Sequence, residues 1–181
     1  FVAGDVAGSA LIRLAINDAV RAVDAIPGRP GPLPDGVVDV AIVGAGPAGL
    51  SAALRCRERG LSCWVLEQDA IAATIRDYPR RKHVMAEPHH VPLLGSLWFE
   101  GCTKEALVER WQALVQSAGL PIQEHTEVLG IERQGELFAL QTARGALLAR
   151  AAVVCVGKRG APRRLGLPGE AHPRVRYALV D

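Results

Sequence analysis

The fold is decided by one stretch of the sequence, Val37-Val38-Asp39-Val40-Ala41-Ile42-Val43-Gly44-Ala45-Gly46-Pro47-Ala48-Gly49. Its first seven residues are almost all apolar and rich in valine, which predicts a strand buried on both faces of a parallel sheet. Residues 47–59 have a helical pattern that ends at Gly60. A second apolar run, residues 61–66, predicts the next strand. Together these segments form a strand–helix–strand crossover of about 30 residues.

The three glycines that follow the first strand have distinct structural roles. Gly44 permits the tight turn out of the strand, Gly46 lets the backbone approach a pyrophosphate, and Gly49 lets the helix pack closely on the strand. The helix that opens with Pro47 and Ala48 presents free N–H groups and a partial positive charge to phosphates. The pattern therefore predicts a dinucleotide-binding site of the Rossmann type.

An acidic residue stands at the end of the next strand. Glu67 is placed to accept hydrogen bonds from ribose hydroxyls, and it would repel a 2′-phosphate. Together with residues 44–49, it is similar to the FAD site of flavoproteins that bind two dinucleotides. Residues 153–157 occupy the place of the second FAD-side motif of those proteins, with Gly157 retained and Val156 in the place of a threonine. We therefore expect the site to bind the ADP half of FAD.

The composition is that of an ordinary globular α/β protein, with 49% apolar and 22% charged residues in 181. A net charge of +2 gives no reason to expect nucleic acid or an anionic membrane as partner. No apolar run reaches the roughly 18–20 residues that span a bilayer. The four cysteines lack the C-x-x-C spacing of zinc sites and redox dithiols, and such scattered thiols favour a reducing compartment, the cytoplasm.

The rest of the chain predicts an α/β domain with a parallel sheet, helices and a small antiparallel excursion around residues 121–150. A helix is expected over residues 9–26, capped by Ser9, and another from Thr103 to about residue 118. Short strands are expected at 122–124, 126–133, 137–142, 147–150 and 151–156. Residues 28–36 are rich in proline and glycine and read as a linker between residues 1–27 and the domain at 37–181.

Residues 37–181 resemble the thioredoxin-reductase-like branch of the FAD-dependent pyridine nucleotide-disulfide oxidoreductases. Five segments carry the resemblance: residues 42–49, residues 65–68, the loop from Thr74 to Tyr78-Pro79, residues 153–157, and Arg163-Arg164-Leu165-Gly166-Leu167-Pro168-Gly169-Glu170 with Tyr177. The resemblance implies that Gln68 and Thr74 belong to the cofactor site. It also implies that residues 158–181 lead toward an NAD(P)H domain, which would lie outside this chain.

By this resemblance the chain is the FAD-binding portion of an NAD(P)H-dependent oxidoreductase. Such an enzyme passes hydride from nicotinamide through flavin to a small-molecule acceptor, a protein disulfide or another acceptor. An FAD-dependent monooxygenase is less favoured, because residues 163–170 resemble the junction of the reductases. The sequence identifies neither catalytic residues nor metal ligands, and a homodimer is left open.

One departure from the family pattern supports an alternative. The family commonly has Gly-Gly before the Tyr-Pro loop, whereas this chain has Ala72-Ala73 followed by Thr74. The added methyl groups lie where the backbone should approach the flavin. The alternative is therefore a non-catalytic, degenerate or truncated dinucleotide-binding module with a regulatory or assembly role.

The N-terminal segment resembles another flavin motif of the same superfamily. Ala3-Gly4-Asp5-Val6 followed by a helix resembles the motif in which an aspartate, here Asp5, binds the ribityl–phosphate region. That motif normally closes the FAD domain, yet here it precedes the first strand. Residues 1–27 are therefore either the tail of an upstream module or a permuted element that completes this site. The permuted reading is slightly favoured, because residues 27–36 are long enough to span a domain face.

Overall fold

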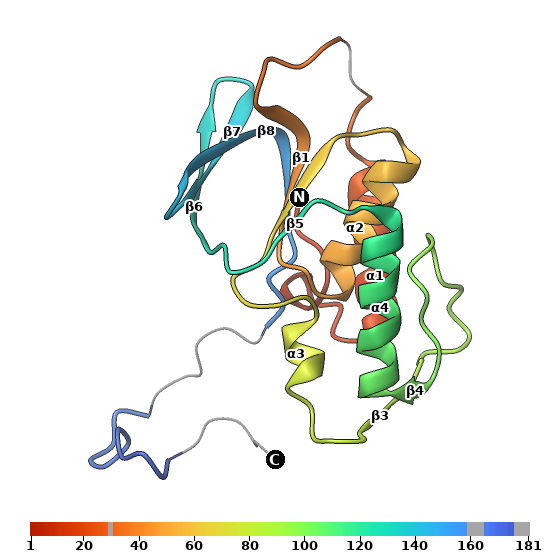
Figure 1. The fold of residues 1–181 in the computed structure, drawn as a ribbon, viewed down its shortest axis with the longest axis vertical. Helices are drawn as coiled ribbons and strands as arrows, with labels where there is room; N and C mark the ends of the chain where they lie inside the picture. Colours follow the sequence, from red (N-terminus) through yellow and green to blue (C-terminus); the bar gives the residue numbers. More distant parts are fainter. Residues whose placement is uncertain (29–30, 159–164, 176–181) are drawn as a thin grey trace.

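A computed structural model describes residues 1–28, 31–158 and 165–175. Its larger sheet has the strand order β5-β2-β1-β8-β7-β6 (Figure 1). Strands β5 (Ile122–Gln123), β2 (Cys63–Leu66), β1 (Val37–Val43) and β8 (Gly145–Val154) run parallel to one another. Strands β7 (Leu137–Thr142) and β6 (Val128–Gln134) continue the same sheet in antiparallel order. This arrangement confirms the expected α/β class with an antiparallel excursion.

Three helices stand together on one face of the sheet: α1 (Ile12–Asp24), α2 (Pro47–Glu58) and α4 (Lys104–Ala118) (Figure 1). The short helix α3 (Ala73–Arg76) and the 3-10 turn η1 (Asp5–Ala7) lie in loops. A separate two-stranded sheet joins β3 (His83–Val84) to β4 (Cys102–Thr103). Helix α4 begins and ends as its sequence predicts, because Thr103 Oγ1 accepts from the N–H of Ala106 and Gly119 has left-handed backbone.

Strand β1 is covered on both faces, as its continuous apolar sequence predicts. Val40 and Ile42 point into the main core between the sheet and the helices. Ala41 and Val43 point to the opposite face, into a smaller core that Leu140 of β7 shares. The antiparallel strands therefore complete the second face of the sheet next to β1, where an additional helical layer would otherwise be needed.

The first residues of the chain lie alongside β8. The amino group of Phe1 donates to the carbonyl of Ala152 at 2.8 Å, and the N–H of Ala3 donates to the carbonyl of Val154 at 3.0 Å. The N–H of Val154 donates in turn to the carbonyl of Phe1 at 2.9 Å. Residues 1–3 thus run parallel to the last residues of β8. They lie on the same side of β8 as β7, which pairs with the first residues of that strand.

Helix α1 packs against α2 and also holds the loop before β4. Asn17 is 1% exposed, its Nδ2 donates to the carbonyl of Pro92 at 2.9 Å, and its Oδ1 accepts from the N–H of Leu94 at 2.8 Å. Arg13 donates to the carbonyl oxygens of Ala86 and Val91. The N-terminal helix is therefore built into the same core as the rest of the described chain.

Three sequence-based expectations for the elements are wrong in detail. Ser9 does not cap α1, which begins at Ile12 after Leu11, because the Ser9 hydroxyl donates instead to Asp18 Oδ2 at 2.6 Å. Strands expected at 147–150 and 151–156 are one strand, β8, since the arginine at position 150 does not interrupt the pairing. The strand expected at 126–133 begins at Val128, because residues 124–126 form a loop against the end of β2.

Candidate functional site

The glycine loop lies at the carboxyl edge of the parallel strands, between β1 and α2. A Cβ atom added to Gly49 would lie 1.8 Å from the carbonyl oxygen of Gly44, so helix and strand approach too closely for any other residue. At Gly44, where φ is +102°, an added Cβ would lie 2.6 Å from the carbonyl oxygen of Cys155. These two glycines are required by the protein's own packing.

Gly46 differs from its two neighbours because the protein does not fill the space beside it. A Cβ atom built on Gly46 meets no protein atom within 4 Å, and the residue has extended backbone at the N-cap of α2. The first turn of a helix carries N–H groups that have no partner inside the helix. The backbone at Gly46 can therefore approach an anionic group directly, as a pyrophosphate site requires.

Glu67 connects the end of β2 to the glycine loop. Its carboxylate is 8% exposed, Oε2 accepts from the N–H of Ala45 at 2.6 Å, and Oε1 accepts from the N–H of Asp69 at 2.9 Å. Each carboxylate oxygen has a further lone pair that can accept from a hydroxyl. The same carboxylate thus fixes the glycine loop and lies beside it, at the position where the sequence predicts a ribose contact.

The loop after β2 is held to the glycine loop by a backbone hydrogen bond and to the end of β5 by a side chain. The N–H of Ala72 donates to the carbonyl of Ala45 at 3.0 Å, and Glu124 Oε1 accepts from the N–H of Ile71 at 2.7 Å. Ala72 is buried and has left-handed backbone with φ +58° and ψ +31°. This left-handed backbone explains why the family commonly has glycine here, because the conformation is strained for alanine.

The N-terminal Gly-Asp segment lies against the first turn of α2. A Cβ atom added to Gly4, where φ is +84°, would lie 3.0 Å from the Cβ of Ala48 and 3.5 Å from that of Ala15. Asp5 follows directly and opens the turn η1 with its side chain partly exposed. The structure thus places Gly4, the residue before Asp5, against the helix that follows the glycine loop.

The remaining predicted site residues lie around the same edge. Gln68 and Thr74 are exposed, on the loop after β2 and in α3, and Gly157 has φ +66° just beyond β8. Val156, at the position of the family's threonine, is 53% exposed. Of the motif at 163–170, the Glu170 carboxylate accepts from the N–H groups of Leu165 and Gly166, whereas Arg163, Arg164 and Tyr177 lie outside the described residues.

Sequence reasoning missed two residues that shape the site. Ala45 contributes its N–H to Glu67 and its carbonyl to Ala72, and Glu124 holds the N–H of Ile71. Backbone contacts of this kind leave no pattern of residue types. Glu124 did carry a signal, because an acidic residue at the end of β5 must lie near the acidic residue at the end of the neighbouring parallel strand β2.

One thiol lies under the loop. Cys155 is 6% exposed, and its N–H donates to the carbonyl of Val43 at 2.8 Å. Burial raises the pKa of its thiol to about 12, and the amino group of Phe1 opposes that shift. Cys155 is therefore a neutral packing residue at neutral pH and contributes no thiolate to the site.

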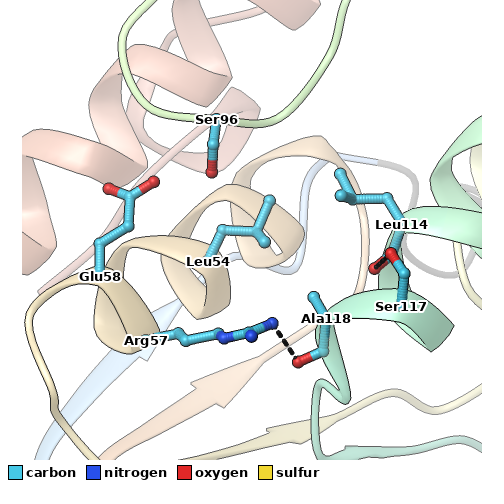
Figure 2. A pocket seen from close by; sticks show the side chains of 7 residues that line it. All are labelled: Leu54, Arg57, Glu58, Ser96, Leu114, Ser117 and Ala118. Carbon is cyan, nitrogen blue, oxygen red and sulfur yellow. Dashed lines mark hydrogen bonds between the residues drawn. The ribbon is translucent and has the colours of Figure 1, made fainter.

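A separate surface hollow of about 400 Å³ lies between the last turns of α2 and α4 (Figure 2). Leu54, Glu58 and Ser96 line one side, and Arg57 crosses toward α4, where its guanidinium donates to the carbonyl of Ala118. Helix α2 has 12 residues and is therefore about 18 Å long. The hollow lies at the end of α2 away from the glycine loop and does not belong to the dinucleotide site.

Two kinds of feature are absent from the part of the chain that the structure describes. Within residues 1–28, 31–158 and 165–175, no group of three or more histidine, cysteine, aspartate or glutamate side chains is arranged to hold a metal ion. In that same part of the chain, no helix has the length and apolar character that a membrane crossing needs.

Residues 41–181 match the family model described as pyridine nucleotide-disulphide oxidoreductase. The chain belongs to this family. The match begins inside β1, so the glycine loop and Glu67 lie within it, whereas residues 1–40 lie outside it. The superfamily resemblance predicted from the glycine loop, the acidic strand end and Gly157 is confirmed.

Relatives and solved structures agree with this assignment. A ferredoxin–NADP reductase from Ignicoccus hospitalis is 28% identical over 144 residues, which are 79% of this chain and 44% of the relative. One from Paraburkholderia xenovorans is 34% identical over 149 residues, 80% of this chain and 39% of the relative. The bacillithiol disulfide reductase of Staphylococcus aureus shares the fold, with a TM-score of 0.65 at 20% identity, over 76% of this chain and 43% of that one. The chain thus spans less than half the length of the proteins it resembles.

Proposed function

We propose that this chain binds FAD and forms the FAD-binding portion of an NAD(P)H-dependent flavoprotein oxidoreductase. The observation that carries the proposal is the contrast among the three glycines. Two of them are required by protein packing, while Gly46 faces space that the protein leaves free at a helix N-terminus. A dinucleotide pyrophosphate is the group that such a loop accommodates.

Different residues of the chain bind different parts of FAD. The loop at Gly46 and the first turn of α2 hold the pyrophosphate with backbone N–H groups. Glu67 accepts from ribose hydroxyls with the lone pairs that Ala45 and Asp69 do not use. When bound, the flavin supplies the two-electron chemistry of the enzyme, and the protein holds and orients it.

We propose further that residues 1–27 complete this site in permuted order. Three contacts support this reading: residues 1–3 pair with β8, Gly4 packs on Ala48, and α1 packs on α2. Asp5 then provides its carboxylate near the ribityl–phosphate region from the beginning of the chain. The linker at 28–36 connects this element to β1, and residues 158–181 lead toward an NAD(P)H domain.

The electron acceptor is proposed as either a disulfide or a small electron-carrier protein. The relatives named ferredoxin–NADP reductase favour the carrier, and the disulfide reductase that shares the fold favours the disulfide. Ala72 supports the second candidate function, a non-catalytic dinucleotide module, because its methyl group stands where the family has glycine. A homodimer and a cytoplasmic location remain predictions.

The first experiment measures FAD binding by the purified chain. Titration with FAD, followed by quenching of flavin fluorescence, is expected to show saturable binding with one flavin per chain. Asp5→Ala is expected to weaken this binding at least tenfold, and Asp35→Ala, which changes an exposed aspartate in the linker, is the matched control. Absence of FAD binding by the wild-type chain contradicts the cofactor proposal, and equal binding by the Asp5 variant contradicts the permuted reading.

The second experiment tests the activity of the full-length protein that the gene encodes. NADPH or NADH is added under anaerobic conditions, and the loss of the visible absorbance of oxidised flavin is followed. Oxidised ferredoxin or an aromatic disulfide is then supplied as acceptor. Bleaching followed by turnover supports the reductase, whereas a flavin that neither nucleotide bleaches favours the non-catalytic module.

A further inference from the structure

Lys104, the first residue of α4, holds the loop of residues 77–82 that joins α3 to β3. Its ammonium group donates to the carbonyl of Arg76 at 2.7 Å and also to the carbonyl of Tyr78. Its backbone N–H donates to the carbonyl of Lys82 at 2.9 Å. One half-buried residue of α4 therefore binds the last residue of α3 and both ends of the loop that follows it.

Hydrogen bonds connect the Lys104 ammonium to the glycine loop through α3. Arg76, whose carbonyl accepts from Lys104, donates its own N–H to the carbonyl of Ala72 at 3.0 Å. Ala72 donates its N–H in turn to the carbonyl of Ala45, also at 3.0 Å. Ala45 is the second residue of the glycine loop, residues 44–49. The lysine side chain on α4 is therefore linked to the glycine loop through the backbone at the two ends of α3.

Helix α3 has only 4 residues, so its position depends on contacts with the rest of the domain. Helices shorter than about 12–15 residues are at best marginally stable by themselves in water. The last carbonyl groups of a helix have no partner inside it, and Lys104 supplies a donor to that of Arg76. At the other end of α3, Ala72 has strained left-handed backbone. Lys104 is thus a charged donor at the end of a short helix that carries Thr74, a predicted cofactor residue.

We propose that Lys104 is a positioning residue for the FAD site, and that it acts on the cofactor through α3 and Ala72. The inference rests on the proposed FAD binding, because it adds a residue to that same site. Without the ammonium group, the end of α3 loses its charged hydrogen bonds, and the N–H of Ala72 is held less firmly against Ala45. The backbone beside the glycine loop then samples more conformations, so FAD binding costs more ordering entropy.

The link between Lys104 and the glycine loop is tested first without the cofactor. Hydrogen exchange of single backbone amides is measured by NMR in the wild-type chain and in Lys104→Met, which replaces the ammonium by an apolar, unbranched side chain. Exchange at the Ala72 amide is expected to become about tenfold faster. Exchange at the Trp111 amide, in the middle of α4, is expected to stay unchanged. Unchanged exchange at Ala72 would overturn the proposal.

Titration with FAD then measures the effect on the site. Lys104→Met is expected to weaken FAD binding by about tenfold, because the charged hydrogen bonds to the end of α3 are lost. Lys104→Arg keeps a positive charge and several N–H donors, and is expected to bind FAD within about threefold of the wild-type affinity. Arg144→Met is the matched control, since it removes one positive charge from the exposed turn between β7 and β8, and wild-type affinity is expected. At saturating FAD, the visible circular dichroism of the flavin is expected to change in Lys104→Met and to return in Lys104→Arg.

Failure of this inference and failure of the proposed function give different results. If the wild-type chain binds no FAD, the proposed function is wrong, and the role of Lys104 is wrong with it. If the wild-type chain binds FAD and Lys104→Met binds it equally well, or with an unchanged flavin spectrum, only the role of Lys104 is wrong. An equal loss of affinity in Arg144→Met means a general effect of charge and overturns that role as well. Far-ultraviolet circular dichroism confirms that each variant is folded. If Lys104→Met does not fold, Lys104→Gln replaces it with the same expected changes.

Discussion

Glu67 Oε2 accepts a hydrogen bond from the N–H of Ala45 at 2.6 Å, so the acidic strand end holds the glycine loop directly. The second oxygen of the same carboxylate accepts from the N–H of Asp69 at 2.9 Å. A carboxylate that accepts from two backbone N–H groups stabilises the folded domain even before a ligand is present. Structural support and ligand recognition therefore reside in one side chain.

Replacing Glu67 by glutamine tests this double role. The amide retains one acceptor and turns an NH₂ group toward a backbone N–H, so one charge-assisted hydrogen bond is lost. We expect the free energy of unfolding in urea to fall by about 1–2 kcal/mol, and the affinity for FAD to fall as well. Glu127→Gln, an exposed change in the segment that follows, is the control. An unchanged unfolding midpoint for Glu67→Gln would contradict the structural role.

The glycine loop offers a matched pair of substitutions. Gly49→Ala places a methyl group 1.8 Å from the carbonyl oxygen of Gly44 and is expected to destabilise the domain by at least about 3 kcal/mol. Gly46→Ala meets no protein atom and is expected to cost about 1 kcal/mol or less. Its methyl group enters the pyrophosphate space, so FAD affinity should fall at least tenfold. Thermal unfolding and FAD titration of both variants separate packing from binding, and wild-type affinity in Gly46→Ala would refute the assigned phosphate site.

The sequence predicts the crossover and its glycine loop well because the relevant constraints are local. A buried parallel strand, a glycine turn and a helix start each leave a pattern of residue types. The same reasoning places Thr103 correctly as a cap but fails at Ser9, whose hydroxyl is drawn to Asp18 once the helix has formed. It divides β8 into two strands, because pairing with β1 and β7 extends a strand further than its own composition indicates.

Contacts between distant segments are the part that sequence patterns do not provide. The pairing of Ala3 with Val154 and the hydrogen bonds of Asn17 join residues far apart in the chain. These hydrogen bonds form only when the tertiary fold brings the two segments together. In the sequence, Asn17 is one polar residue of an amphipathic helix. Nothing in that pattern indicates that the loop at 92–94 packs against its side chain.

Removal of the Asn17 amide tests how far α1 supports that loop. Asn17→Ala leaves the carbonyl of Pro92 and the N–H of Leu94 without their side-chain partner. We expect the free energy of unfolding to fall by about 2–3 kcal/mol, and hydrogen exchange at the Leu94 amide to become faster. Arg21→Ala, at a side chain 67% exposed on the same helix, should change stability by about 0.5 kcal/mol or less. Unaltered exchange at Leu94 would show that α1 does not hold the loop.

Burial of Cys155 predicts loss of stability at alkaline pH. Its pKa rises from the ordinary 9.0 to about 12 in the folded state, so the unfolded chain releases this proton first as the pH increases. The stabilisation is complete below pH 9 and is lost as the pH rises from 9 toward 12. Cys155→Ala should show a shallower decline of unfolding free energy over this range, by up to about 1.4 kcal/mol per pH unit. Parallel declines in the two proteins would exclude this thiol as the cause.

The left-handed backbone of Ala72 predicts that a glycine is better accommodated there. Left-handed conformation costs alanine roughly 1–2 kcal/mol, and loss of the buried methyl group and the greater freedom of an unfolded glycine offset part of the gain. Ala72→Gly is therefore expected to raise the free energy of unfolding by up to about 1 kcal/mol, measured in urea. The matched control is Ala73→Gly, at the first residue of α3, where helical backbone makes the same change cost about 0.5–1 kcal/mol. FAD titration of Ala72→Gly then bears on function: a gain in affinity means that the alanine methyl narrows the flavin site, and unchanged affinity removes the main argument for a degenerate module. Equal destabilisation by both glycine substitutions would contradict the strain assigned to Ala72.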